Sequence, residues 1–431
     1  MIRLLFILFF TLFIEHCFAQ QITLDSAIAI AMRNSPGLMI AKNNVNIAGI
    51  NNNYGIAGGL PLVQGTSNVT QQMTSLEQKY SNPLNNKSST NAPSNNINAG
   101  FSASVPFFAG GKIQNEKHRL DVVESQSKQQ YYSRAQTLIY NVILKYYDVV
   151  RQQEYAKTLE ASIRASNQRL EIVKQQQAVG VANDADLFQS QVDLNTQTQN
   201  LIAQQLVIDQ TKTDLLTLMI LNPDSTIQVK DTIVVDKSIR LDSILDAAYQ
   251  NPDIQAAYDQ IRINQYLEKE VGALRYPSAS VSLGYNFSRT TNPQGFNQLN
   301  QAYGPIVGLG VTIPIFNGGI YKRQQEVAGI NVATAKLQKD TLMLNVHSAA
   351  VKNWQAYLNN LQQLETAKQN FELSQKLLNL VLMRFQYKVA TIVDVTLAQQ
   401  SFENAGFQLV NVSYAAKAAE VQLRRLANQL P

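Results

Sequence analysis

The sequence predicts a mixed α and β membrane protein that consists of two tandem structural repeats. Three features lead to this fold class: a long-range internal repeat, two long stretches without proline, and segments in which apolar and polar residues alternate. The repeat is seen where Ser104–Gly111 returns as Thr312–Gly319, an interval of 312 − 104 = 208 residues. Asp186 and Asp394 keep the same interval (394 − 186 = 208), which indicates two copies with no insertion between these points.

The first residues have the pattern of a secretory signal peptide, which we place at residues 1–19. Arg3 precedes an apolar run from Leu4 to Ile14, and Ala19 is a small residue suited to cleavage. The run is shorter than the about 20 apolar residues that a membrane-spanning helix needs. Cleavage after Ala19 removes Cys17, the single cysteine of the chain, so we expect no disulfide in the mature protein.

The composition argues against nucleic-acid binding and against catalysis. The formal net charge of +5 is small for 431 residues and is spread out, which is typical of a solvated surface rather than of a nucleic-acid partner. His118 and His347 show no metal-ligand spacing, and the sequence has no phosphate-binding glycine loop and no nucleophile motif. We therefore expect no enzyme activity, no metal and no cofactor.

Two proline-free stretches predict very long helices, because a proline inside a helix costs about 3 kcal/mol. The first stretch lies between Pro106 and Pro223, and the second between Pro314 and Pro431. In the first, a helix would extend over roughly 100 Å before a turn at residues 180–184, after which a second helix returns. Narrow apolar stripes on these helices predict antiparallel coiled-coil packing rather than a thick globular core.

A shorter helix is expected before each β-hairpin. The candidates are Leu38–Ala57 in the first copy and Ile254–Leu274 in the second, where a short segment at Leu241–Tyr249 comes before it. The returning helix of each long hairpin is shorter than the outgoing one. We therefore expect the short helix to stack on the end of the returning helix and to restore its height.

Three segments alternate between apolar and polar residues with the period of a β-strand. They lie at Phe101–Phe107, Ala279–Phe287 and Val307–Ile315. Their polar positions are mainly Ser, Gly, Thr and Asn, which is typical of the wall of a wide lumen in a transmembrane barrel. A fourth strand after Pro61 is predicted mainly by repeat symmetry, and hairpin loops are expected at Ser75–Asn96 and Arg289–Gln301.

The expected domain boundaries follow from these elements. Repeat 1 covers residues 20–222, with a β-hairpin at about 61–108 and a helical hairpin at about 110–221. A linker covers residues 223–240. Repeat 2 covers residues 241–431, with a β-hairpin at about 277–316 and a helical hairpin at about 318–429. The junctions between strands and long helices are expected at Pro106, Gly110, Gly111, Pro314, Gly318 and Gly319.

Two β-hairpins give only four strands per chain, which sets the minimum assembly. Lipid does not tolerate an open sheet edge, and known bacterial barrels have at least about eight strands. Strands must therefore be pooled between chains, eight from two copies or twelve from three, and the small lumen residues favour the larger barrel. A stand-alone porin-like channel and a structural coiled-coil protein of the envelope remain as alternatives.

Motifs in a fixed order identify a known family. Leu24-Asp25-Ser26-Ala27 is followed by Asn34-Ser35-Pro36, then by two Pro-x-Phe-x-Gly-Gly segments and by Val389–Val395. In order and duplication these motifs resemble the TolC family of outer-membrane efflux proteins. The resemblance implies a homotrimer in the outer membrane of a Gram-negative bacterium, with a twelve-stranded β-barrel and an α-helical tunnel in the periplasm. It further implies a passive exit duct, in tripartite efflux or type I secretion, that a periplasmic adaptor and an inner-membrane pump open.

The resemblance also places the functional site at the turns between the long helices. In the family, aspartates just after one turn form a ring that faces the pore, and Asp394 matches the first of them. The second would fall at Leu397, so one acidic ring is lost. A family latch of Tyr, Arg and Asp aligns with Phe385, Ala390 and Asp186, of which only the aspartate is retained.

Further residues of the turns complete the predicted site. The glycine of the first turn persists at Gly180, whereas Lys388 takes its place in the second copy, and Asp184 is an additional acid. The resemblance implies that the adaptor docks at the turns, which hold Gly180, Val181, Lys388, Val389 and Ala390. Aspartates at a helix start are often caps, and this alternative stays open for Asp186 and Asp394.

Overall fold

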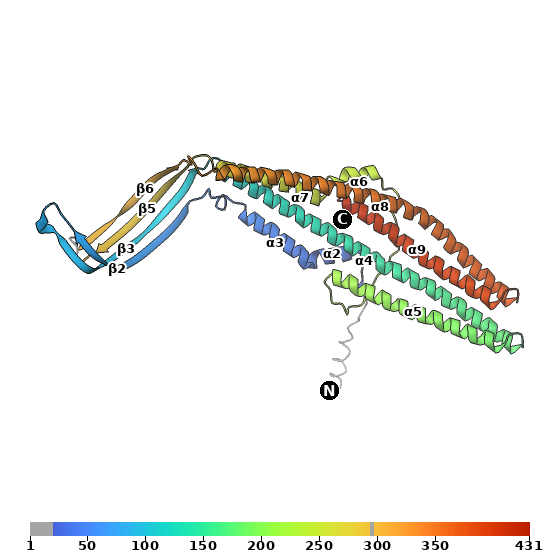
Figure 1. Cartoon of the computed structure of the whole chain (residues 1–431). Coiled ribbons are helices and arrows are strands. Elements are labelled where there is room, and N and C mark those ends of the chain that lie inside the picture. Colours follow the sequence, from blue (N-terminus) through green and yellow to red (C-terminus); the bar gives the residue numbers. More distant parts are fainter. Residues whose placement is uncertain (1–19, 294–296) are drawn as a thin grey trace, which may run out of the picture. The chain divides into compact units, whose positions relative to one another are not determined.

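The computed structural model describes residues 20–293 and 297–431, and the predicted signal peptide at 1–19 lies outside the described residues. The chain divides into two compact units, each built from segments that are distant in the sequence. Unit 1 consists of the residues up to Lys42, Gln129–Gln255 and Thr341–Pro431, and unit 2 of Asn43–Lys128 and Ala256–Asp340. Both repeats therefore contribute to both units, and Figure 1 shows the elements along the chain.

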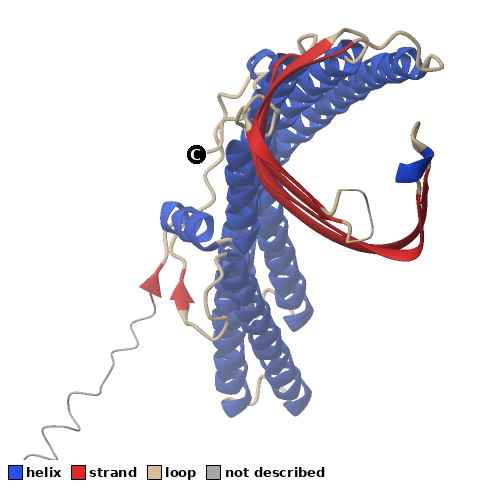
Figure 2. Ribbon diagram, turned by 90° about the vertical axis from the view of Figure 1, so that its left-hand side faces the viewer, coloured by secondary structure: helices blue, strands red, loops and turns tan. Residues whose placement is uncertain are grey.

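Unit 2 contains a four-stranded antiparallel sheet. Its strands are β2 (Leu62–Gln78), β3 (Lys87–Phe108), β5 (Ser278–Thr291) and β6 (Leu299–Thr312), in the spatial order β2-β3-β5-β6. One hairpin comes from each repeat, and β3 and β5 join them. Figure 2 shows the four strands as one strongly curved sheet. The strand expected after Pro61 by symmetry is confirmed as β2.

The register of the sheet aligns like residues of neighbouring strands. Phe101 on β3 pairs with Tyr285 on β5, and the next pair is Ser102 with Gly284. Residues directly opposite each other in an antiparallel pair point to the same face, and successive pairs alternate between the faces. The sheet therefore has one largely apolar face and one face of mainly small polar residues, as the alternation predicted.

The predicted loops at Ser75–Asn96 and Arg289–Gln301 are too long. The four strands continue into these segments and leave only residues 79–86 and 292–298 between them. The first of these loops contains a short 3-10 helix, η2 (Pro83–Asn85). The composition, rich in Asn, Ser and Gln, suggested loops, but cross-strand hydrogen bonds satisfy the backbone whatever the side chains are. β-propensity is a weak guide where side chains are exposed.

Each repeat contributes one long helical hairpin. In repeat 1, α4 (Lys112–Ala178) leads to α5 (Asp184–Leu218), and in repeat 2, α8 (Ile320–Gln386) leads to α9 (Ile392–Leu426). Helices α4 and α8 both have 67 residues, and α5 and α9 both have 35. The bounds in repeat 2 lie 208 residues after those in repeat 1 (320 − 112 = 208), which confirms the internal repeat. Among the residues described, no helix combines the length and the apolarity needed to cross a membrane.

An apolar core forms where α4 meets its neighbours in unit 1. The residues that predicted the apolar stripe of α4, Ile139, Val142, Tyr146 and Val149, are at most 3% exposed. They pack in one cluster with Leu215 of α5. The helical period of apolar residues and the absence of proline thus explain both the length of α4 and the face that it buries.

Short elements connect the hairpins. They are β1 (Gln20–Gln21), α2 (Leu24–Asn34), α3 (Pro36–Asn51), β4 (Ile227–Gln228), α6 (Leu241–Ala248) and α7 (Pro252–Ala273), and β1 pairs with β4 in parallel. The Asn34 side chain donates to Met219 O at 3.2 Å, and that of Asn251 donates to Leu426 O at 3.2 Å. These bonds hold the start of α3 at the end of α5 and the start of α7 at the end of α9, as expected for stacked helices.

Pairs of glycines connect the strands to the long helices. All four have positive φ: Gly110 (59°), Gly111 (84°), Gly318 (65°) and Gly319 (76°). A Cβ at Gly110 would lie 2.7 Å from Tyr276 Cβ, so both conformation and space demand glycine there. Pro106 lies beside a β-bulge at the end of β3, and Pro314 follows the end of β6.

Candidate functional site at the helical turns

The first turn joins α4 to α5 through a glycine in the left-handed conformation. Gly180 has a φ of 75°, and its N–H donates to Gln177 O at 2.9 Å. Val181 N–H donates to Gln176 O at 2.8 Å, which completes the hydrogen-bond pattern that commonly ends a helix at a glycine. Glycine adopts this conformation without steric cost.

The second turn repeats this backbone without a glycine. Lys388 has a φ of 62°, and its backbone N–H donates to Phe385 O at 3.1 Å. Val389 N–H donates to Arg384 O at 2.9 Å. A non-glycine residue in this region costs roughly 1–2 kcal/mol. The turn therefore keeps its geometry against a local strain that the first turn avoids.

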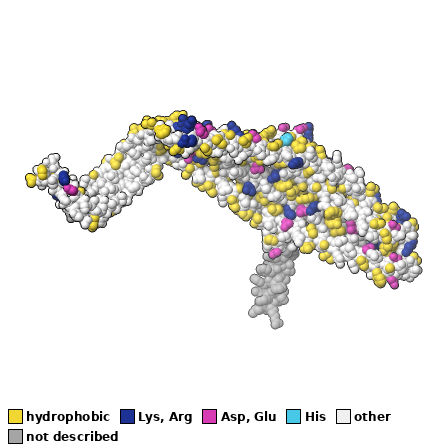
Figure 3. Space-filling view, viewed as in Figure 1, with side chains coloured by type: hydrophobic (Ala, Val, Ile, Leu, Met, Phe, Trp, Pro, Cys, Tyr) yellow, Lys and Arg dark blue, Asp and Glu magenta, His cyan; other side chains and the backbone are white. Residues whose placement is uncertain are grey.

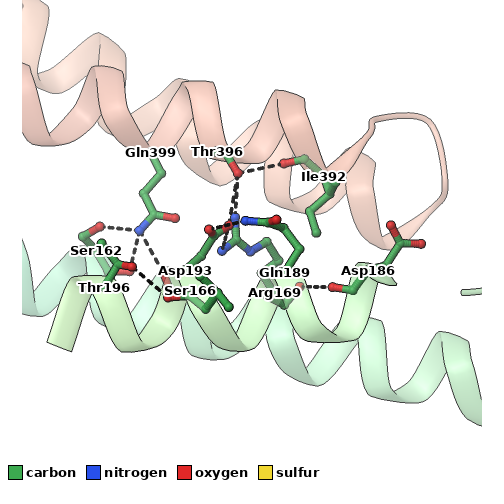
Figure 4. A network of polar contacts seen from close by, with 12 residues as sticks. Ser162, Ser166, Arg169, Asp186, Gln189, Asp193, Thr196, Ile392, Thr396 and Gln399 are labelled. Carbon is green, nitrogen blue, oxygen red and sulfur yellow. Dashed lines mark hydrogen bonds and ion pairs between the residues drawn. The ribbon is translucent and has the colours of Figure 1, made fainter. Parts of the chain in front are cut away.

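The predicted acids occupy the first turns of the returning helices. Asp184 accepts a hydrogen bond from the Gln177 side chain at 2.6 Å. The N-cap of α5 is Asn183, whose Oδ1 accepts from Asp186 N–H at 2.8 Å. Within the described chain the carboxylate of Asp186 receives no hydrogen bond, and Figure 4 shows it pointing away from the neighbouring polar contacts.

Asp394 makes more contacts than its counterpart Asp186. Its carboxylate accepts from Thr391 N–H at 2.7 Å and from Thr391 Oγ1 at 2.8 Å, and its own N–H donates to Thr391 Oγ1 at 3.2 Å. This is a reciprocal capping box at the start of α9. The bonds from Thr391, first the backbone one, lower the pKa of the exposed Asp394 carboxyl. The cap engages the carboxylate in part and leaves it solvated.

Two of the three positions that we expected to align with the family latch, Phe385 and Ala390, belong to an apolar cluster. Phe385 is 5% exposed and lies in a cluster with Val395 and Phe402, against which Ala390 also packs. This cluster joins α4, α8 and α9 near the turns. Phe385 and Ala390 thus pack against apolar neighbours. Leu397, where we expected the second acid of the family, is 56% exposed.

A buried charge that sequence reasoning missed lies in the same region. Arg169 of α4 is 0% exposed, and its Nη2 lies 2.6 Å from Asp193 Oδ2 of α5. Its Nη1 donates to Thr396 Oγ1 of α9 at 2.9 Å (Figure 4). Gln189 supports Asp193 with a hydrogen bond of 2.8 Å. Burial lowers the pKa of the Arg169 guanidinium, and Asp193 opposes this shift.

A second group of polar contacts continues this seam between α4 and α9. Gln399 Nε2 donates to Ser162 Oγ at 2.6 Å and to Ser166 Oγ at 2.8 Å. Ser162 also donates to Glu403. Since Ser162, Ser166 and Arg169 follow one face of α4, these contacts hold α9 against α4 along two helical turns.

One sequence signal could have revealed the seam. Arg169 lies between Ala165 and Ile172, at the spacing of an apolar helical stripe. A charged residue inside such a stripe usually requires a buried partner. In the structure this partner is Asp193, on the returning helix of the same hairpin.

Comparisons with known proteins agree with the fold and the repeat. The family model described as outer membrane efflux protein matches residues 27–219 and 244–429, once in each repeat. The chain is 25% identical to outer membrane protein TolC of Vibrio cholerae over 330 residues, which are 72% of this chain and 73% of that protein. It is 21% identical to toxin and drug export protein A of Aggregatibacter actinomycetemcomitans over 403 residues, which are 92% of this chain and 84% of that protein.

The fold is also that of a solved structure. A crystal structure of CusC, described in connection with transmembrane channel formation, matches with a TM-score of 0.77 at 17% identity and covers 95% of this chain and 93% of that one. The family resemblance expected from the motifs is thus confirmed. The chain belongs to the outer membrane efflux protein family, and its function is that of an outer-membrane exit duct for efflux.

Proposed function

We propose that three copies of this chain form the outer-membrane duct of a tripartite efflux or type I secretion system. The observation that carries the proposal is the open sheet. Its order leaves β2 and β6 at the edges, without a partner strand in the described chain. Unpaired edges are not tolerated in lipid, and three four-stranded sheets supply a twelve-stranded barrel.

The apolar face of the sheet suits contact with lipid. On β6, Val307 is 77% exposed and Leu309 is 70% exposed, and they pair with Leu283 and Val281 of β5. Exposed apolar residues in continuous rows are unusual on a surface that faces water. The opposite face, with its small polar residues, suits a water-filled lumen.

The distribution of charge supports the placement of the strands in the membrane. The charged residues of the four strands are Glu77, Lys87 and Arg289, all close to the hairpin loops. Figure 3 shows the strand region of the viewed face almost free of charged side chains between the loops and the start of the long helices. We infer that the loops face the exterior and that the helices lie in the periplasm.

The turns are the proposed gate and the docking site for a periplasmic adaptor, which acts with an inner-membrane pump. The duct itself is passive. Three copies of the exposed Asp394 would concentrate negative charge in a confined mouth. A single ring should favour cations and should be blocked by multivalent cations less strongly than the double ring of the family.

The assembly is tested by mass measurement of the purified protein in a mild detergent. We expect a trimer that dissociates on heating. A stable monomer would contradict both the pooled barrel and the ring at the turns.

The role of Asp394 is tested by single-channel recording in planar bilayers. Asp394→Ala should reduce cation preference and relieve block by millimolar divalent or trivalent cations, since it removes the charge of the ring. Asp186→Ala should keep the selectivity and raise conductance if Asp186 retains part of the latch. Unchanged selectivity in Asp394→Ala would restrict this residue to its capping role.

A further inference from the structure

Basic residues gather at the end of the sheet that leads into the long helices. In unit 2, β3 continues there into α4, α7 leads into β5, and β6 continues into α8. The pairing of β3, β5 and β6 brings these three connections to the same end of the sheet. Figure 3 shows Lys and Arg side chains gathered where the strands meet the helices, with a few acidic ones among them. Residues 106–115, 270–277 and 313–326 of the connections contain four basic residues, Lys112, Arg275, Lys322 and Arg323.

This basic cluster has little counter-charge. The same three segments contain two acidic residues, of which Glu270 is buried and already paired with an arginine of α4. Within the described residues, no carboxylate oxygen lies within 4.0 Å of Arg275 or Arg323, and Lys322 reaches only the exposed Glu326, at 4.0 Å. An ion pair between exposed groups contributes little. The cluster therefore has positive charge available to attract an anion.

Packing between the end of α7 and the start of α8 brings cations of different elements together. Arg275 Nη1 donates to Gln325 Oε1 of α8 at 3.2 Å. Lys322 lies three residues before Gln325 and therefore on the same side of α8. Arg323 Nη2 donates to Gly318 O in the connection before α8. A guanidinium carries several N–H donors, so these single bonds leave donors of both arginines for a further ligand.

The position of the cluster along the strands matches one boundary of a membrane. Strand β5 has 11 uncharged residues, Ser278–Ser288 (288 − 278 + 1 = 11), between Arg275 and Arg289. A transmembrane β-strand needs about 9–11 residues to cross the hydrocarbon core. Arg289 lies close to the hairpin loop, so in the proposed membrane placement Arg275 lies at the level of the periplasmic headgroups.

Large apolar side chains stand exposed beside the cluster. Tyr276, Ile315 and Phe316 are 62%, 93% and 88% exposed. Aromatic side chains are typical of the interface between hydrocarbon and headgroups. The surface thus presents an apolar part next to a cationic part, which is the chemistry of an anionic lipid in reverse.

We propose that Arg275, Lys322 and Arg323 bind the headgroup phosphate of an anionic phospholipid in the periplasmic leaflet of the membrane. The acyl chains of this lipid lie against the exposed apolar side chains beside the cluster. The inference rests on the proposed placement of the strands in the membrane and adds a ligand and the residues that hold it. Guanidinium groups suit this ligand because they bind two phosphate oxygens at once.

Native mass spectrometry of the purified protein in mild detergent tests the site, with added phosphatidylglycerol or phosphatidylcholine of the same acyl chains. We expect at least threefold more bound phosphatidylglycerol than phosphatidylcholine per trimer. Arg275→Gln/Lys322→Gln/Arg323→Gln should remove this preference, because it removes the charge that the anionic headgroup requires. All three positions are exposed, so the variant should still give the mass of a trimer.

A matched control removes the same charge elsewhere on α8. Lys352→Gln/Lys368→Gln/Lys376→Gln changes exposed residues far along the helix from the sheet and should retain the preference for phosphatidylglycerol. Loss of the preference in this control would reduce the effect to net charge and would overturn the lipid site.

The remaining outcomes separate the lipid site from the proposed duct. A trimer without a preference for phosphatidylglycerol, or with one that survives the exchange of all three cations of the site, would overturn the lipid site and leave the duct intact. Equal competition by glycerophosphoglycerol, the headgroup without acyl chains, would indicate a site for a free phosphate and would also overturn it. A monomer in the same spectrum would overturn the duct and the lipid site together.

Discussion

The two helical turns have the same backbone but different residues at the positions that define it. Gly180 ends α4 and Lys388 ends α8, both with positive φ and both followed by valine. The N-cap is Asn183 in the first turn and Thr391 in the second, and only the second has a reciprocal capping box. One turn thus has the residue best suited to its helix end, and the other has the better helix start.

The contrast between the repeats extends to the corresponding residue stripes of α4 and α8 near the turns. The stripe of α4 is covered within the chain and holds a buried Arg169, whereas the stripe of α8 is exposed and holds Leu377 at that position. A buried charge requires fixed partners, which a single chain can provide. The stripe that a helix of the same chain covers holds the buried ion pair, and the exposed stripe has an uncharged residue at the corresponding position.

The largest expected effect comes from giving α4 the residue that α8 has at the corresponding position. Arg169→Leu leaves Asp193 without its cation and removes the bond to Thr396, so it should destabilise the region by about 2–4 kcal/mol. The free energy of local opening of α4 and α9 near the turns, measured by native-state hydrogen exchange, should fall by that amount.

Two variants control this experiment. Arg164→Leu makes the same change on an exposed position of α4 and should alter the opening free energy by no more than about 0.5 kcal/mol. Arg169→Leu/Asp193→Ser introduces the residues found 208 positions later, Leu377 and Ser401. It should recover most of the loss, because no unpaired charge remains. If Arg169→Leu leaves the opening free energy unchanged, the ion pair contributes nothing to the stability of the contact between α4 and α9.

The next effect exchanges the residues that end the outgoing helices. Gly180→Ala should weaken the first turn by about 1 kcal/mol, because alanine is strained at positive φ. Lys388→Gly should strengthen the second turn by about 0.5–1 kcal/mol, since it relieves that strain. Hydrogen exchange of the last turns of α4 and α8 measures both. Changes of the same sign in the two turns would contradict the strain assigned to Lys388.

Much of this fold could be predicted from the sequence, because its signals are long and repeated. The proline-free stretches predicted α4 and α8, and the 208-residue interval aligned every bound of the two long hairpins. The strand ends were missed because the hairpins extend through Asn- and Ser-rich segments, where backbone pairing decides the structure. The fold followed from periodicity, whereas the strand ends depended on tertiary pairing.

The site was predicted less completely. The family resemblance located the turns and both aspartates, but it gave no information on residues that this chain uses in place of the latch. Arg169 was missed because an ion pair between α4, α5 and α9 depends on which helix faces lie together. Periodicity marks a stripe as buried but does not identify the helix that covers it.

The smallest effect tests the helix starts through pH. The pKa of the Asp394 carboxyl is lowered by its bonds from Thr391, so the ionised form is favoured in the folded protein. A depressed pKa contributes stability that is present above the ordinary value of about 3.9 and is lost as the pH falls through the folded value. The first turn of α9 should therefore lose protection against hydrogen exchange between about pH 4 and the lower folded pKa.

Asp394→Asn should remove this pH dependence of protection. Asp186→Asn should retain it, because the Asp186 carboxylate accepts no hydrogen bond in the described chain. If Asp394→Asn keeps the acid-dependent loss of protection, another group holds the start of α9, and the contrast between the two caps is wrong.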